Sequence, residues 1–244
     1  MGACAPVFVQ RETSFPVRLI SVEHSLVIAV RTERCHRTLQ RLADSRPSPT
    51  AGSATREVTR GPLPSGQDAR VITRVLWLNG TVGVGKTTVA AAVAERLAAD
   101  GDAVAFIDTD SLGDLSPRPS DDPFNTRLVA KNLAAVTANF SAAGARSLVV
   151  AGVIQGIRDL ELYEAAISVR PTLVRLIVPA PELDVRLLQR HGELDPDGLR
   201  WHADRAPTLA AILDESGLSM LDVSNLGQPD QTARAVLNAA DWAP

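Results

Sequence analysis

The chain has 244 residues, of which 45% are hydrophobic and 22% charged, and its formal net charge is −3 at pH 7. This composition is typical of a globular protein with a buried core, and no stretch approaches the roughly 18 uninterrupted apolar residues that a membrane span requires. The two cysteines, Cys4 and Cys35, lack the spacing of a zinc site or of a disulfide framework. Because the N-terminus also lacks the pattern of a signal peptide, we expect a cytoplasmic protein without a membrane partner.

Residues 1–70 differ in composition from the rest of the chain. They carry ten arginines and six acidic residues, whereas residues 71–244 have an excess of acidic residues. The stretch 44–68 is rich in Pro, Ser, Gly and Thr and has no apolar period, which predicts a largely disordered extension or linker. The segment is either a poorly ordered part of the native protein or translated sequence upstream of its true start. A nucleic-acid-binding arm is not favoured, because the arginines are interspersed with acidic residues and lack aromatic neighbours.

From residue 71 onward, short apolar runs alternate with segments of helical period. In chain order, the pattern predicts a strand at 71–79, a helix at 86–99, a strand at 103–108, a helix near 123–140, a strand at 147–154, a helix at 159–168, a strand at 172–180, helices at 181–191 and 204–216, a strand at 219–224 and a helix at 229–240. Strands that alternate with helices form a parallel sheet with helices on both faces. We therefore predict one α/β domain over 71–244, a three-layer fold with a five-stranded parallel sheet. Its ligands should bind at the carboxyl ends of the strands.

A glycine-rich stretch follows the first predicted strand. Residues 80–87 read GTVGVGKT, which is the spacing G-x-x-x-x-G-K-T of a phosphate-binding loop, and a helical pattern follows directly. The glycines let successive backbone N–H groups turn toward phosphate oxygens, and the helix adds its positive N-terminal dipole. Lys86 is expected to contact the β- and γ-phosphates, and the hydroxyl of Thr87 to bind Mg²⁺. The structural alternative is a glycine-rich turn with an exposed lysine.

The stretch predicts a nucleoside triphosphate as ligand together with Mg²⁺, and it leaves the base of the nucleotide open. The predicted nucleotide-binding residues are Gly80, Thr81, Val82, Gly83, Val84, Gly85, Lys86, Thr87 and Thr88.

Two aspartates follow the second predicted strand, in the stretch FIDTD. Asp108 closes the strand, where a carboxylate can hold the metal through its waters, and Asp110 is placed to accept a proton from a substrate hydroxyl. Turn formation and helix capping are the structural alternative for both residues, since aspartate is common at such positions.

A phosphate-binding loop followed by a strand that ends in D-x-D, in a compact five-stranded domain, resembles the small P-loop kinases. These include shikimate, gluconate and adenylylsulfate kinases and chloramphenicol phosphotransferase, which are relatives of adenylate kinase. The resemblance covers residues 71–244. It implies an ATP-dependent kinase that acts on a small molecule or a nucleotide, with Asp108 near Mg²⁺ and Asp110 on the acceptor hydroxyl.

The third predicted strand departs from this family. It ends in LVVAG, so that Ala151 and Gly152 stand where the relatives have an acidic residue or a glycine triplet. The identity of the acceptor therefore does not carry over. Side chains that could contact the acceptor are Arg118, Arg127, Gln155 and Arg158. For Gln155 and Arg158, a surface loop is the structural alternative.

The segment after the fourth predicted strand corresponds in these kinases to a lid. Lid arginines reach the transferring phosphoryl group, and the resemblance implies this role for Arg186 and Arg190. A surface ion pair between Glu182 and Arg186, with Arg190 in solvent, is the alternative. The turn at 225–229 corresponds to one that packs beside the adenine.

The predicted catalytic residues are thus Lys86, Asp110, Arg186 and Arg190, and the predicted metal ligands are Thr87 and Asp108. A second interpretation is an ATP-binding switch that hydrolyses slowly and acts through a partner, because the third strand lacks an acidic residue. The sequence leaves the oligomeric state open.

Overall fold

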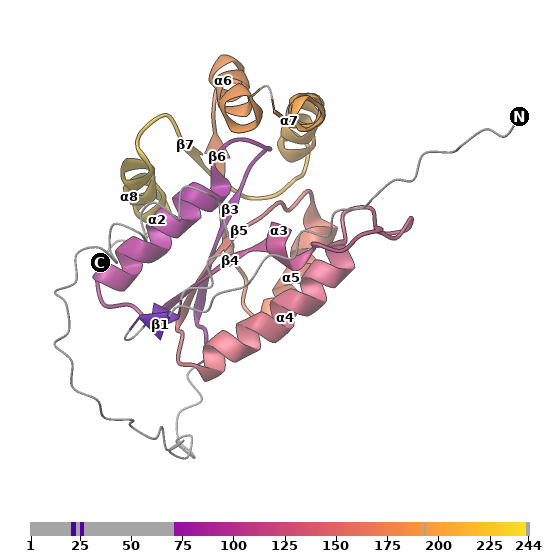
Figure 1. The fold of residues 1–244 in the computed structure, drawn as a ribbon. Coiled ribbons are helices and arrows are strands. Elements are labelled where there is room, and N and C mark those ends of the chain that lie inside the picture. Colours follow the sequence, from indigo (N-terminus) through magenta and orange to yellow (C-terminus); the bar gives the residue numbers. More distant parts are fainter. Residues whose placement is uncertain (1–20, 23–24, 27–70, 193, 243–244) are drawn as a thin grey trace, which may run out of the picture.

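A computed structural model of the chain describes residues 21–22, 25–26, 71–192 and 194–242 (Figure 1). The disorder predicted for residues 1–70 concerns residues that lie outside these ranges, apart from β1 (Ser21–Val22) and β2 (Ser25–Leu26), which pair with each other in antiparallel fashion. Every helix in the described ranges is too short or too polar to cross a bilayer.

A five-stranded parallel sheet forms the centre of the domain. In spatial order its strands are β4 (Val104–Asp108), β5 (Ser147–Ala151), β3 (Arg74–Asn79), β6 (Thr172–Ile177) and β7 (Leu221–Ser224). All neighbours pair in parallel, which confirms the predicted fold class. In the register of the sheet, Asp108 lies opposite Ala151, and Ala151 lies opposite Leu78. The carboxyl ends of β4, β5 and β3 are therefore level with one another.

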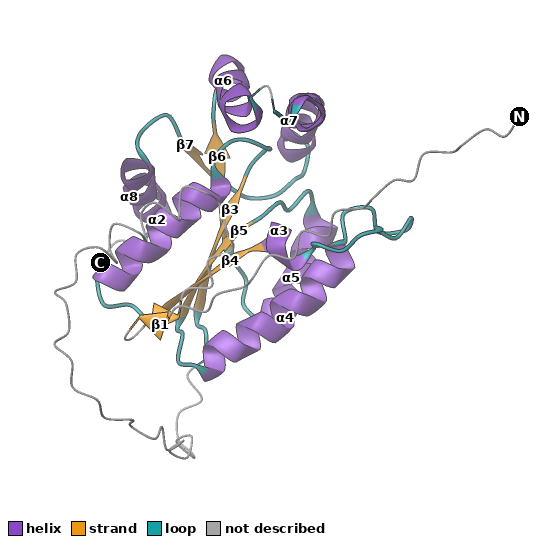
Figure 2. Cartoon of the chain, in the orientation of Figure 1, coloured by secondary structure: helices purple, strands orange, loops and turns teal. Residues whose placement is uncertain are grey.

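Helices cover both faces of the sheet, as Figure 2 shows. One face carries α2 (Lys86–Ala99) and α8 (Pro229–Ala239), and the other carries α4 (Thr126–Ala142) and α5 (Ile157–Ile167). These three layers agree with the prediction.

Two further helices, α6 (Ala180–His191) and α7 (Pro196–Asp214), lie beside each other near the carboxyl end of the sheet (Figure 1). The prediction that the second of these begins at residue 204 is wrong. Asp195 caps α7 by accepting a hydrogen bond from the N–H of Gly198, and a proline at the first helical position is favourable. A glycine in the first turn and Pro207 inside the helix are poor helix formers, so the sequence pattern there resembles a loop.

Several other boundaries also differ from the prediction, and one short helix was not predicted. A short helix, α3 (Thr109–Leu112), follows β4 directly and has no apolar period that could reveal it. The third large-sheet strand ends at Ala151, earlier than the predicted residue 154, because the chain then turns toward α5.

Two apolar cores lie on opposite faces of the sheet, because successive side chains of a strand point to opposite sides. Leu76 and Leu78 of β3 pack toward α2 and α8, whereas Trp77 packs toward α4 and α5. The indole N–H of Trp77 donates to the carbonyl of Gly152 (3.2 Å), and its ring stacks on Tyr163 with centroids 5.1 Å apart. Burying each large apolar side chain stabilises the fold by about 1.5–3 kcal/mol. This packing holds β3, and with it the loop that β3 leads into.

Candidate functional site

The glycine-rich loop connects the central strand β3 to α2. Gly83 and Gly85 have φ angles of +80° and +91°, which residues with a Cβ atom rarely adopt. A Cβ on Gly83 would lie 2.7 Å from Leu187 of α6, and a Cβ on Gly85 would lie 2.8 Å from the side-chain nitrogen of Asn225. Backbone conformation and close neighbours thus both require glycine at these positions.

Two side chains of the loop are buried in the protein, while N–H groups of its backbone have no partner among the described residues. Val84 is buried, and the Thr81 hydroxyl donates to the carbonyl of Ala206 in α7 (2.6 Å). The backbone N–H groups of residues 81–87 donate no hydrogen bond to any part of the chain that the structure describes. The N-terminus of α2 also lacks a side-chain cap. Unpaired donors in a turn, followed by a helix N-terminus, are suited to bind a phosphate anion.

Lys86 lies across this loop. Its ammonium donates to the carbonyls of Gly80 (3.1 Å) and Thr81 (3.0 Å). Burial lowers the pKa of Lys86, and the nearby carboxylates of Asp110 and Asp108 act in the opposite direction. An ammonium that is poorly solvated and close to unpaired N–H groups would gain from an anionic ligand.

Asp108 uses its two carboxylate oxygens differently. Oδ2 accepts a hydrogen bond from the Thr87 hydroxyl (2.7 Å), and Oδ1 accepts one from the backbone N–H of Asp110 (3.0 Å), which caps α3. Burial raises the pKa of Asp108, and the hydrogen bond from Thr87 partly offsets this effect. The capping alternative considered for Asp108 is therefore real, and it leaves the oxygen beside Thr87 available for another role.

The Thr87 hydroxyl and the Asp108 carboxylate form a donor set of oxygens alone. Mg²⁺ prefers oxygen ligands and commonly takes only one or two from the protein, with water and phosphate completing its shell. These two side chains fit that requirement. Within the described ranges, no group of three or more His, Cys, Asp or Glu side chains forms a metal site by itself.

Asp110 lies in α3 with its carboxylate exposed. Its side chain forms no hydrogen bond or ion pair with the described parts of the chain, although its charge is close enough to raise the pKa of Lys86. The structure thus brings Lys86, Thr87, Asp108 and Asp110 together at the carboxyl end of β3 and β4.

The two arginines predicted in the lid segment have different surroundings. Arg186 donates to the carboxylate of Glu182 (3.0 Å) and to the backbone carbonyl of Asn225 (2.7 Å). Arg190 forms no ion pair with a described residue, and its charge lowers the pKa of Lys86. Arg190 is therefore free to meet an anion near the loop, whereas Arg186 would first have to leave its partners. Catalytic roles for both remain predictions.

The arginines named as acceptor candidates are mostly engaged elsewhere. Arg127 pairs with Asp121 (2.6 Å), and Arg118 donates to the carbonyl of Pro123 (3.4 Å). Arg158 is exposed at the start of α5. Arg118 and Arg127 thus both bond to residues 121–123, in the segment before α4.

Gln155 takes part in a contact that the sequence did not suggest. Its Oε1 accepts a hydrogen bond from Arg205 of α7 (3.1 Å), and the Arg205 guanidinium lies over the ring of Phe124, 5.0 Å from its centroid. Phe124 comes from the Pro-rich segment before α4 and is half-exposed. The segments that carry Phe124, Gln155 and Arg205 are distant in sequence but in contact here, and no local sequence pattern predicts such contacts.

The space beside Gly152, just after the third strand, has no room for a side chain. A Cβ at Gly152 would lie 2.9 Å from Cγ2 of Thr109 and also against its hydroxyl, and Thr109 is buried. The N–H of Gly152 donates to the carbonyl of Leu78 (3.2 Å), which keeps the two chains close. Any side chain at position 152 would have to displace the side chain of Thr109, which lies between Asp108 and Asp110 in the chain.

We predict that Gly152→Ala destabilises the protein by about 1–3 kcal/mol, because overpacking at a fixed backbone forces neighbours to shift. Urea unfolding of the variant measures the loss. The double variant Gly152→Ala/Thr109→Ala should lose less stability than the two single variants together, because removing the threonine methyl and hydroxyl relieves the contact. Wild-type stability of Gly152→Ala would contradict the steric explanation.

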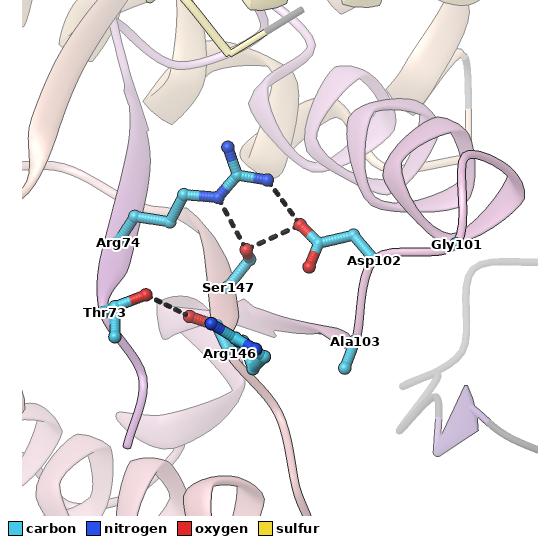
Figure 3. Close-up of a pocket in the computed structure, with 7 residues that line it drawn as sticks. All are labelled: Thr73, Arg74, Gly101, Asp102, Ala103, Arg146 and Ser147. Carbon is cyan, nitrogen blue, oxygen red and sulfur yellow. Dashed lines mark hydrogen bonds and ion pairs between the residues drawn. The ribbon is translucent and has the colours of Figure 1, made fainter. Parts of the chain in front are cut away.

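A hollow of about 360 Å³ lies at the opposite, amino-terminal end of the sheet (Figure 3). Arg74 donates to Asp102 (2.6 Å) and to the hydroxyl of Ser147 (2.8 Å), and that hydroxyl donates to Asp102 (2.6 Å). The Arg74 guanidinium also lies over the ring of Trp242. These polar groups hydrogen-bond to one another, and the bonds connect the starts of β3, β4 and β5. We therefore interpret the hollow as a structural feature, remote from the glycine-rich loop.

The parallel sheet, the glycine-rich turn from β3 to α2 and the Lys86–Thr87 pair together define a P-loop protein, as the sequence predicted. The chain belongs to the AAA domain family, which matches residues 76–197, half of its length. No curated protein sequence matches the chain.

The solved structures that are similar to this chain include those of three proteins. A gluconokinase from Sinorhizobium meliloti 1021 is 20% identical, with 70% of this chain and 93% of that one covered and a TM-score of 0.47. The tunicamycin resistance protein of Deinococcus radiodurans is 20% identical, with 70% and 97% covered and a TM-score of 0.49. The APS kinase of Mycobacterium tuberculosis in complex with AMPPNP and APS is 20% identical, with 70% and 99% covered and a TM-score of 0.45. At these values the similarity says nothing about substrates.

Proposed function

We propose that this protein is an ATP- and Mg²⁺-dependent phosphotransferase of the cytoplasm that acts on a small molecule or a nucleotide. One observation carries the proposal: unpaired N–H groups of residues 81–87, the Lys86 ammonium and the carboxylates of Asp108 and Asp110 meet at one end of the sheet. Hydrogen-bond donors that can bind a triphosphate thus lie beside two carboxylates, one of which can bind a metal and the other an acceptor hydroxyl.

The donor half of the site would hold the triphosphate. The free N–H groups bind phosphate oxygens, and Lys86 exchanges the carbonyls of Gly80 and Thr81 for the β- and γ-phosphates. Thr87 and Asp108 would hold Mg²⁺, which when bound neutralises charge between these phosphates. Because the loop is braced by its buried side chains, the donors are arranged before the nucleotide arrives, and such preorganisation favours catalysis.

The acceptor half of the site would centre on Asp110. Its carboxylate orients the acceptor hydroxyl and takes its proton as the acceptor oxygen forms a bond to the γ-phosphorus. The bond between that phosphorus and the β–γ bridging oxygen breaks, and ADP leaves. Arg190, which has no described ion-pair partner, would offset charge on the transferred group, and Arg186 could do so after leaving Glu182 and Asn225.

ADP release by the purified full chain tests the proposal. The rate is measured with ATP and Mg²⁺ alone and then with panels of hydroxylated metabolites, nucleosides, nucleotides and antibiotics. We expect at least one acceptor to raise ADP release above the basal rate, the phosphorylated product to be visible by mass spectrometry, and EDTA to abolish both. Binding of ATP without any acceptor-dependent release across the panels would argue against a kinase.

A second candidate function is an ATP-binding switch with slow hydrolysis. Two observations favour it: Gly152, packed against Thr109, leaves no acidic side chain at the end of β5, and Arg186 is already engaged. A switch would release ADP slowly at a rate that no acceptor changes, so the same assay separates the two functions.

A further inference from the structure

Asn225 stands at the junction of β7 and the turn that leads to α8. It is 6% exposed, and its backbone N–H continues the sheet by donating to the carbonyl of Ile177 (2.9 Å). Its side-chain nitrogen donates to the carbonyl of Val84 in the glycine-rich loop (2.7 Å), and its side-chain oxygen accepts from the Thr232 hydroxyl (2.8 Å). Because a backbone carbonyl can only accept, the nitrogen of the amide must be the atom that faces Val84.

This hydrogen bond determines the orientation of one peptide group in the loop. The peptide between Val84 and Gly85 is planar and trans, so its carbonyl and its N–H point in opposite directions. With the carbonyl held by Asn225, the N–H of Gly85 points away from Asn225, and it has no acceptor among the described residues. A peptide next to glycine rotates easily unless something holds it, since glycine lacks the steric limits of other residues.

Close packing adds to this restraint. A Cβ on Gly85 would lie 2.8 Å from the side-chain nitrogen of Asn225, so glycine is what allows the amide to reach the loop. The backbone carbonyl of Asn225 also accepts a hydrogen bond from Arg186 of α6 (2.7 Å). One buried residue therefore connects the phosphate-binding loop, α8 and the helix that carries both lid arginines.

We propose that Asn225 is a positioning residue for nucleotide binding: through Val84 it presents the Gly85 N–H to a phosphate oxygen. This role rests on the proposed binding of ATP. This role differs from the contact with the adenine base that the sequence suggests for the turn at 225–229, because Asn225 bonds to the loop and not to the nucleotide.

The test compares two variants that each remove one hydrogen bond of Asn225. Asn225→Asp keeps the acceptor for Thr232 and the carbonyl for Arg186 but places a carboxylate oxygen against the carbonyl of Val84. Thr232→Val removes the bond on the other side of the amide and leaves the bond to Val84. Isothermal titration with Mg·ATP, well below both melting temperatures, measures the affinity, and a crystal structure of free Asn225→Asp shows the loop.

For Asn225→Asp we expect an ATP Kd raised by at least about tenfold, with the Val84 carbonyl turned away from residue 225. For Thr232→Val we expect the Kd to stay within about twofold of wild type, even where its melting temperature falls. Equal losses of affinity in the two variants, or an unchanged loop and Kd in Asn225→Asp, would overturn the positioning role.

Two further outcomes and one further variant complete the test. If wild type binds no ATP, the proposed function fails, and the orientation of the Val84 peptide in the crystal structure still decides whether Asn225 holds the loop. Asn225→Ser, which is uncharged and too short to reach Val84, should reproduce the loss of affinity. If neither Asn225 variant folds, the residue serves the fold itself and the positioning role is overturned.

Discussion

Replacing Lys86 with alanine is expected to reduce phosphoryl transfer below detection while leaving the fold intact. The Lys86 ammonium already lies within the loop, 3.1 Å and 3.0 Å from two loop carbonyls, and would exchange them for phosphate oxygens. Removing one preorganised hydrogen-bond donor that stabilises transition-state charge costs about 10²- to 10³-fold in kcat, and weakened ATP binding adds to this loss. ADP release with the acceptor found in the panel, together with the Kd for Mg·ATP, measures both effects.

The chain provides a matched control for this substitution. Lys131, the only other lysine, is exposed on α4, far along the chain from the loop. Lys131→Ala should keep wild-type turnover and affinity. The melting temperature of Lys86→Ala should stay close to wild type, because burial already disfavours its charge and the freed carbonyls can bind water. Substantial turnover by Lys86→Ala would show that the loop does not serve catalysis.

The sequence predicts the sheet and the loop well because both depend on local patterns. Apolar strand runs of the right length alternate with helical periods, and the spacing of GTVGVGKT needs only its own backbone and the helix behind it. The start of α7 was missed for an equally local reason: Gly198 and Pro207 lower helix propensity, while the energy that keeps the helix comes from packing of Ala206, Leu209 and Leu213.

The contacts that complete the site are long-range and leave no signal in one sequence. Asn225 and Val84 are separated by 141 positions, yet they share the hydrogen bond that orients the loop. In the sequence, Gly152 is only a difference from the motif of the small P-loop kinases. The structure shows that Thr109 occupies the space that a side chain at position 152 would need. Residue types at strand ends can thus be predicted as candidates, whereas their partners are set by how the chain packs.

Asp110→Asn is expected to separate binding from chemistry. The hydrogen bond that α3 needs at this position comes from the backbone N–H of Asp110 to Asp108, and the carboxylate itself has no described partner. Asparagine therefore preserves the cap and the shape of the site while removing the proton acceptor. Loss of a general base lowers kcat by about 10²- to 10⁴-fold. The Kd for Mg·ATP should change little, because Asp110 does not contact the loop through any hydrogen bond.

Asp114→Asn is the control, since Asp114 is also exposed and lies just beyond α3. It removes the same charge nearby without touching the cap of α3, and it should turn over as wild type does. A fall in kcat for Asp110→Asn but not for Asp114→Asn would assign the effect to the position of the carboxylate, because general electrostatics would affect both variants. Full transfer by Asp110→Asn to the true acceptor would show that Asp110 is only a helix residue, and a different group would have to take the acceptor proton.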